Sequence, residues 1–332
     1  MQTQQTIQKN CQAPLVTFIV TYYQLPVEML CECLDSILAT SLSNSEREII
    51  VVDDGSEQSP LGALNKYLNN IIYVRQRNAG PGEARNRGMQ IATGQYLQFV
   101  DADDYLIRTP YEHCLDIARY QQPDVVMFDF TDAPSGKNTG IFNTEDLESG
   151  ARYLSQYNLR ATACGYLFKR NILGNLHFTT DIYNHEDEEF TPQLLLRAET
   201  ICSTDAQAYY YRRRQHSLTS ENDKRKMVKR LNEHLLVIKK LAHIADTLPT
   251  EERLALSRRV AQLTMDYIYT IIVQTRDRHF LDRKLDNLRQ LGFFPLPDRD
   301  YTTKYKWFRR LTNSSAGLSL LMNVLPYMNK ER

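Results

Sequence analysis

The chain has 332 residues, of which 42% are hydrophobic and 24% charged, as is typical of a globular protein with a sizeable core. Forty basic residues balance forty acidic ones, so no net field attracts nucleic acid, and we expect no nucleic-acid partner. Six cysteines without a zinc-binding spacing, and no apolar run near the roughly 18 residues of a membrane span, predict a cytoplasmic protein with reduced thiols.

The first part of the chain alternates short apolar segments with segments of helical periodicity. Apolar runs predict strands at residues 14–20, 48–52, 71–74, 96–100 and 124–130. Helical spacing predicts helices at residues 27–38, 61–69, 82–92 and 111–120. Continuous apolar strands separated by helices favour an α/β fold, with a mostly parallel sheet covered on both faces. Ligands of such sheets bind beyond the carboxyl ends of the strands.

The rest of the chain changes from a mixed to a helical pattern. We predict helices at 143–156 and 190–197, a strand at 206–212, and only helices after about residue 222. The predicted organisation is a polar tail at residues 1–13, an α/β domain at 14–220 and an all-helical C-terminal region at 221–332.

Three carboxylates directly follow the strand at 96–100. Side chains two residues apart in an extended segment point to the same side, so Asp101 and Asp103 converge just beyond the strand end. Hard oxygen ligands suit Mg²⁺ or Mn²⁺, which usually share their coordination shell with substrate phosphates. The same spacing is also typical of a solvated loop, so the pattern alone leaves both interpretations open.

A second pair of carboxylates, Asp53 and Asp54, follows the strand at 48–52. These groups could accept hydrogen bonds from a base or a ribose, or they could cap a turn. Gly80 and Arg85 lie where the helix at 82–92 begins, which favours bound anions. The segment lacks the third glycine of a dinucleotide fingerprint and follows the third strand, which argues against a Rossmann dehydrogenase.

Residues 185–190 gather several acidic groups at the start of a helix. One of these carboxylates could act as a general base on an acceptor hydroxyl. The alternative is that these acids only complement the helix dipole.

The order of the motifs is more specific than any motif alone. They are, in sequence, Val16 to Tyr23, Val51-Val-Asp-Asp-Gly-Ser56, Asn78-x-Gly80 with Ala84-Arg85-Asn86-x-Gly88, Thr93-Gly94-x-Tyr96, Asp101-x-Asp103-Asp104, Glu186-Asp187-x-x-Phe190, and Tyr211-Arg212 before Ser217. This series resembles the bacterial members of glycosyltransferase family 2 over residues 14–220. The resemblance implies a GT-A fold, a mixed and mostly parallel sheet flanked by helices around a nucleotide-sugar cleft.

The resemblance also implies roles for individual residues. Thr21 and Tyr23 would line the base pocket, Asp54 would contact the base, and Asp53 would support Asp54. Gly80 and Arg85 would lie near the nucleotide, with Asp101 on the ribose or the metal and Asp103 as the direct ligand of Mg²⁺ or Mn²⁺. Asp187 would be the catalytic base, supported by Glu186.

The implied function is an inverting, metal-dependent transfer of a sugar from a nucleotide diphosphate-sugar, with uracil as the expected base. The acceptor would be the hydroxyl of a glycan or a lipid-linked molecule in cell-surface polysaccharide synthesis. The QxxRW motif of processive relatives is absent, which favours a single transfer. Two alternatives are a sugar nucleotidyltransferase, disfavoured because residues 21–26 contain no glycine, and an inactive sugar-nucleotide-binding subunit.

The C-terminal residues carry a separate signal. Residues 300–332 hold six Lys or Arg against two Asp or Glu, together with aromatic and apolar side chains. This composition suits peripheral contact with the inner face of a membrane, where a lipid-linked acceptor would lie. The alternative, which the composition favours slightly, is a helix packed on the catalytic domain with an exposed basic face.

Overall fold

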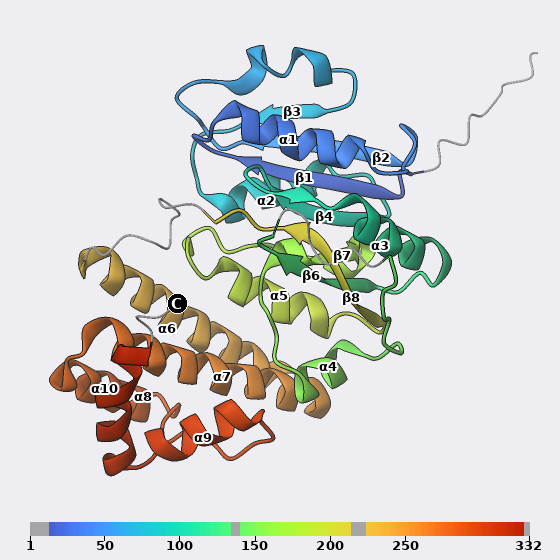
Figure 1. Cartoon of the computed structure of the whole chain (residues 1–332). Helices are drawn as coiled ribbons and strands as arrows, with labels where there is room; N and C mark the ends of the chain where they lie inside the picture. The colour runs from blue at the N-terminus through green and yellow to red at the C-terminus, as the bar shows by residue number, and fades with distance from the viewer. Residues whose placement is uncertain (1–12, 134–139, 214–223, 329–332) are drawn as a thin grey trace, which may run out of the picture.

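A computed structural model describes residues 13–133, 140–213 and 224–328, so most of the predicted N-terminal tail and Ser217 lie outside the described residues. One mixed sheet forms the upper part of the molecule in Figure 1, and the C-terminal helices lie below it. The α/β part and the helical region therefore form two layers in contact.

The sheet is built from eight strands. They are β1 Val16–Tyr22, β2 Arg47–Asp53, β3 Ile72–Arg75, β4 Tyr96–Asp101, β5 Tyr105–Leu106, β6 Val125–Thr131, β7 Tyr166–Lys169 and β8 Ile201–Tyr210. Their spatial order is β3-β2-β1-β4-β7-β6-β8-β5. The first four neighbours are parallel, as are β6 and β8, whereas β7 runs antiparallel to both β4 and β6. The predicted mixed and mostly parallel sheet is confirmed.

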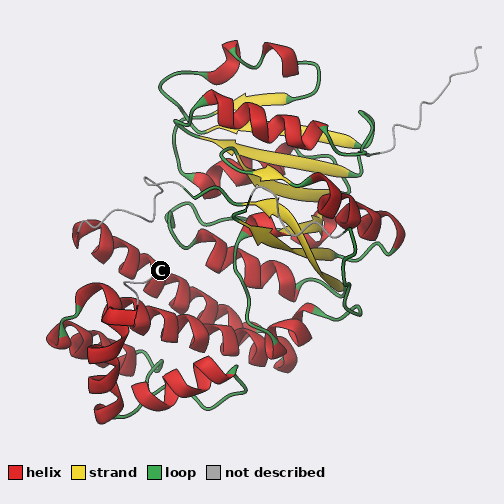
Figure 2. Ribbon diagram, viewed as in Figure 1, coloured by secondary structure: helices red, strands yellow, loops and turns green. Residues whose placement is uncertain are grey.

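Helices lie against the strands of the sheet (Figure 2), and successive side chains on β1 point to opposite faces. Phe18 points to one face, where its ring lies 6.0 Å from that of Tyr111 on α3 (Arg108–Tyr120). Ile19 points to the opposite face and contacts Gly88 on α2 (Pro81–Ile91). Both faces of the central strand are therefore buried, which explains its continuous apolar sequence.

The remaining helices divide between the two parts of the chain. In the α/β part they are α1 Val27–Leu38, α4 Gly150–Gln156 and α5 Glu186–Leu196. The C-terminal region contains α6 Lys224–Thr247, α7 Thr250–Thr275, α8 Arg278–Gln290, α9 Thr303–Thr312 and α10 Ser315–Met328. It packs on the α/β part mainly through α7, which lies against α4 and α5.

The sequence predictions differ from the structure at several elements; for example, α5 begins at Glu186 rather than at residue 190, and β8 begins at Ile201 rather than at residue 206. The predicted helix at 61–69 consists of two short 3₁₀ turns, Pro60–Gly62 and Asn65–Tyr67. The predicted helix at 143–156 is helical only in α4, where the Ser149 hydroxyl accepts a hydrogen bond from the amide of Arg152. Strands β5 and β7 were not predicted, because two to four residues are too short to show a period.

A close approach between α2 and β1 yields a stability prediction. A Cβ atom placed on Gly88 would lie 2.2 Å from Cγ2 of Ile19. We therefore expect Gly88→Ala to lower the free energy of unfolding by about 1–3 kcal/mol through overpacking, measured by urea denaturation. Gly62→Ala is the matched control, since a Cβ atom at that position would have no neighbouring atom within 4 Å. Equal effects of the two substitutions would contradict this account of the α2–β1 contact.

Candidate functional site

The carboxyl ends of three parallel strands bring the predicted residues to one edge of the sheet. Thr21 on β1 is the register partner of Asp101 on β4, and its hydroxyl donates to Oδ1 of Asp101 over 3.3 Å. Tyr22 on β1 is the register partner of Asp53 on β2. The two acidic clusters predicted from sequence therefore flank the end of β1, as expected for a ligand site of a parallel sheet.

Arg85 connects this edge to the acidic start of α5. Its side chain is only 5% exposed, and its Nη2 atom lies 3.1 Å from Oδ1 of Asp101. Its Nη1 atom lies 2.9 Å from Oδ1 of Asp187 and 3.3 Å from Oε1 of Glu186. The guanidinium also lies over the rings of Phe99 and Phe178. One buried cation thus holds together three carboxylates that are far apart in the sequence.

The electrostatics of this cluster favour partial protonation. Burial, and then the charge of Asp187, raise the pKa of Glu186 to about 8, although Arg85 acts in the opposite direction. Burial also raises the pKa of Asp187, while Arg85 and the amide of Ala163 lower it. That amide donates to Oδ2 of Asp187 over 3.0 Å. Asp187 is therefore fixed through both carboxylate oxygens, and its side chain keeps 21% exposure.

Asp54 organises the loop that leads into α2. Its two oxygens accept hydrogen bonds from the side chains of Gln76 and Asn78 and from the amides of Ala79 and Gly80. Gly80 has a φ of 94°, which favours glycine, and it directly precedes Pro81 at the start of the helix. A Cβ atom added to Gly80 would meet the ring of Tyr183.

The oxygens of Asp53, like those of Asp54, are occupied by partners within the protein. It is fully buried and accepts hydrogen bonds from the amide of Ser56 and the hydroxyl of Tyr73, and Arg75 pairs with it at 3.5 Å. A base contact from Asp54 would have to share oxygens that already accept two bonds each. Tyr23, by contrast, is 45% exposed at the same edge. The roles of Asp53, Asp54, Thr21 and Tyr23 toward a nucleotide stay predictions.

The segment after β4 contains one partly exposed carboxylate, Asp103, and one buried carboxylate, Asp104. Asp103 is partly exposed, and its backbone carbonyl accepts a hydrogen bond from Nε of Arg212. Asp104 is 2% exposed and accepts from the hydroxyl of Tyr209 and the amide of Arg212. Burial, together with the charge of Asp101, raises the pKa of Asp104 to about 8. Asp104 therefore anchors the end of β8, a role that its sequence context did not indicate.

The carboxylates at this edge of the sheet could coordinate a divalent cation only if a bound substrate supplied further oxygen ligands. Asp101 already shares its Oδ1 with Arg85 and Thr21, and Asp103 is the second partly exposed carboxylate. Within residues 13–133, 140–213 and 224–328, no three His, Cys, Asp or Glu side chains are grouped to hold a metal ion. Two carboxylate oxygens suit Mg²⁺ or Mn²⁺ when phosphate oxygens complete the shell.

Comparison with known proteins agrees with this architecture. Residues 17–176 match the family model described as glycosyl transferase family 2. An uncharacterised glycosyltransferase of Bacillus subtilis, EpsJ, is 29% identical over 220 residues, which cover 62% of this chain and 63% of the relative. The poly(ribitol-phosphate) beta-glucosyltransferase of Bacillus spizizenii is 29% identical over 55% of this chain and 30% of the relative. The chain thus matches less than two thirds of the length of each relative.

Solved structures support the fold. The Staphylococcus aureus TarS fragment 1–349 in complex with UDP-GlcNAc superimposes with a TM-score of 0.64 and 19% identity, covering 95% of this chain and 91% of that one. The mannosyltransferase PcManGT from Pyrobaculum calidifontis, solved with GDP-Man and Mn²⁺, gives a TM-score of 0.52 and 14% identity, covering 96% and 88%. At these identities the likeness establishes the predicted GT-A fold.

Proposed function

Because this chain belongs to glycosyl transferase family 2, we propose that it transfers a sugar from a nucleotide diphosphate-sugar to an acceptor hydroxyl, with inversion at the anomeric carbon. The observation that carries this proposal is the Arg85 cluster, which joins Asp187 to Asp101 at the strand ends. A uracil base is the expected donor base, since the TarS structure of the same fold holds UDP-GlcNAc. The expected acceptor is a hydroxyl of a cell-surface glycan or a lipid-linked molecule, and the Bacillus spizizenii relative is named for a hydroxyl-bearing polymer, poly(ribitol-phosphate).

The proposed chemistry follows from the positions of the side chains. Asp187 takes the proton of the acceptor hydroxyl, whose oxygen attacks the anomeric carbon on the face opposite the leaving diphosphate. Arg85 and the amide of Ala163 orient the carboxylate of Asp187 for this step. Glu186 shares the same guanidinium and supports that position. Asp101 and Asp103 would hold Mg²⁺ or Mn²⁺, which would offset charge that develops on the diphosphate.

We expect Asp187→Asn to keep the fold and UDP binding but to lower turnover by at least about 100-fold, because the general base is lost. The assay is release of UDP or GDP from a panel of nucleotide sugars. Burial raises the pKa of Asp187, so wild-type activity should decline on acidification at a higher pH than an ordinary aspartate would give.

The exposed Asp181, in the loop before α5, supplies the matched control Asp181→Asn, which should retain wild-type turnover. Full activity of Asp187→Asn would exclude Asp187 as the base. A wild-type protein that releases no diphosphate from any donor would instead favour an inactive sugar-nucleotide-binding subunit. Formation of a nucleotide sugar and pyrophosphate from a sugar phosphate and a nucleoside triphosphate would favour a nucleotidyltransferase.

The proposed metal ligand has its own test. We expect Asp103→Ala to abolish the dependence of UDP affinity on Mn²⁺, because a carboxylate that bridges metal and protein is removed. Calorimetric titration with UDP, with and without Mn²⁺, measures this dependence. Asp116→Ala on α3 is the control, since Asp116 is an exposed partner of Arg119. Unchanged metal dependence in Asp103→Ala would overturn the assignment.

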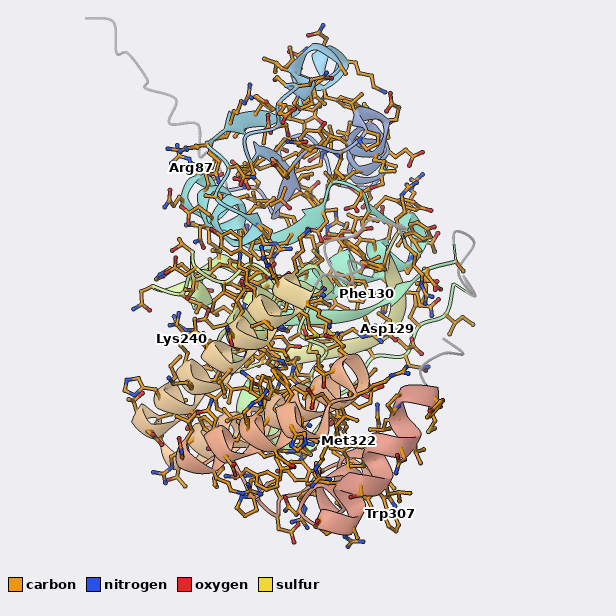
Figure 3. All side chains as sticks on the ribbon, turned by 90° about the vertical axis from the view of Figure 1, so that its left-hand side faces the viewer. Arg87, Asp129, Phe130, Lys240, Trp307 and Met322 are labelled. Carbon is orange, nitrogen blue, oxygen red and sulfur yellow. The ribbon has the colours of Figure 1, made fainter. Side chains whose placement is uncertain are left out.

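We also propose that α9 and α10 contact an anionic bilayer surface. Five large apolar side chains of these helices are exposed: Trp307, Leu320, Val324, Tyr327 and Met328. The two helices contain four Lys or Arg and no acidic residue, although Lys306 and Arg309 pair with Asp300 and Asp298. Figure 3 shows Trp307 at the end of the helical region remote from the sheet. No helix in the described part of the chain is long and apolar enough to cross a membrane.

We expect wild-type protein to sediment with phosphatidylglycerol vesicles and not with phosphatidylcholine vesicles, since both apolar burial and charge contribute to binding. The double substitution of Leu320 and Tyr327 by Ser should abolish this binding. The same change at Leu68 and Ile72, which are 47% and 45% exposed near the β3 edge, should not. Equal sedimentation of the two double variants would contradict the proposed surface.

A further inference from the structure

The acidic start of α5 is held from outside the α/β part by α6 and α7. We propose that Arg259, Lys240 and His234 form a brace that positions the carboxylate of Asp187, so that the helical region acts as part of the catalytic architecture. This inference rests on the proposed function, because it assigns Asp187 the role of the base. The sequence of these helices carries no motif that would indicate such a role.

Each member of the brace contacts a different residue of α5 or its N-cap. Arg259 on α7 is 4% exposed and forms an ion pair with Glu188. The ammonium of Lys240 on α6, which Figure 3 labels, lies 3.0 Å from the hydroxyl of Thr179 and 3.5 Å from Oε1 of Glu189. The ring of His234 on α6 stacks on that of His185, with centroids 4.4 Å apart.

The helical period explains why these contacts bear on Asp187. Residues three and four apart share one face of a helix, so His185, Glu188 and Glu189 all face α6 and α7. Glu186 and Asp187 lie between them in sequence and project toward Arg85 instead. The first turn of α5 is thus held on two sides, by the brace on one and by α2 and β4 on the other. A rotation or shift of α5 would move the Asp187 carboxylate away from its partners.

The loop before α5 is joined to the same helices. Oε2 of Glu233 accepts hydrogen bonds from both the amide and the side-chain nitrogen of Asn184, at 3.2 and 2.6 Å. Glu233 and His234 are buried neighbours on α6. The segment that enters α5 therefore has its position set by α6 before the first helical turn begins.

Stability alone is a weak reason for this arrangement. Buried ion pairs often contribute little net stability, because desolvation offsets their attraction, and well-packed apolar side chains stabilise as well or better. The helix dipole explains acids in the first turn but not their pairing with specific, partly or fully buried cations. Fixed, directional contacts are what a catalytic carboxylate requires, since a misplacement of about 1 Å can cost 10²-fold in rate.

The decisive variants are Lys240→Met and Lys240→Arg, because Lys240 is 34% exposed and its replacement leaves no large buried cavity. Arg259→Lys tests the second contact while keeping its charge. Lys239→Met, at the exposed neighbouring position on α6, is the matched control. Each is assayed for UDP affinity by calorimetry, for KM and kcat of donor turnover, and for hydrogen–deuterium exchange of the α5 amides.

We expect Lys240→Met and Arg259→Lys to lower kcat by about 10- to 100-fold without changing UDP affinity or the donor KM. Exchange should accelerate in the first turn of α5 and not in β1 or β4. Lys240→Arg should recover most of the rate, and Lys239→Met should match the wild type.

Unchanged kcat in Lys240→Met and Arg259→Lys would overturn the proposal. So would a loss of UDP affinity with faster exchange throughout the sheet, which would indicate a role in global stability only. If the wild type turns over no donor, the proposed function fails. Faster exchange confined to α5 would then still support the brace.

Discussion

The site depends on one buried guanidinium that is shared by three carboxylates. Arg85 is almost fully buried, and such a charge is tolerated only where opposite charges and hydrogen bonds compensate for lost hydration. Asp101 at the end of β4, together with Glu186 and Asp187 at the start of α5, supplies that compensation. The arrangement requires α2, β4 and α5 to meet at one point. It therefore ties the chemistry at the strand ends to the packing of three elements.

The same requirement accounts for the surroundings of the cluster. On the side of the sheet, Phe99 lies against the Arg85 guanidinium, and its ring packs against those of Phe178 and Phe190. Gly88 lets α2 approach β1 closely, which brings Arg85 within reach of the strand ends. On the far side of α5, the helical region completes the enclosure through α6 and α7. A polar centre is thus surrounded by rigid, mostly apolar contacts, which is the environment that holds a charged group in one position.

Much of the α/β fold was predictable because its signals are local. The strands β1, β2 and β4 are continuous apolar runs, and the last two end at acidic residues that mark the carboxyl edge of the sheet. The sequences of the antiparallel strand β7 and the short strand β5 show no hydrophobic period from which a strand could be predicted. Each of these strands is defined by its pairing with a strand that is distant in sequence. The role of Asp104 was equally hidden, since its partners, Tyr209 and Arg212, lie more than a hundred residues away.

By itself, the sequence determined the order of the elements, the family resemblance and the identity of the acidic clusters, because these depend on residue type and spacing along the chain. Only the tertiary structure decided which carboxylates share a cation and which face the helical region. It also decided which carboxylates have both oxygens occupied by hydrogen bonds from a loop. Asp54 and Asp187 look alike as acidic residues in sequence, yet one is enclosed by four loop donors and the other is held between Arg85 and Ala163. Such differences arise from partners that folding brings together, and no local pattern encodes them.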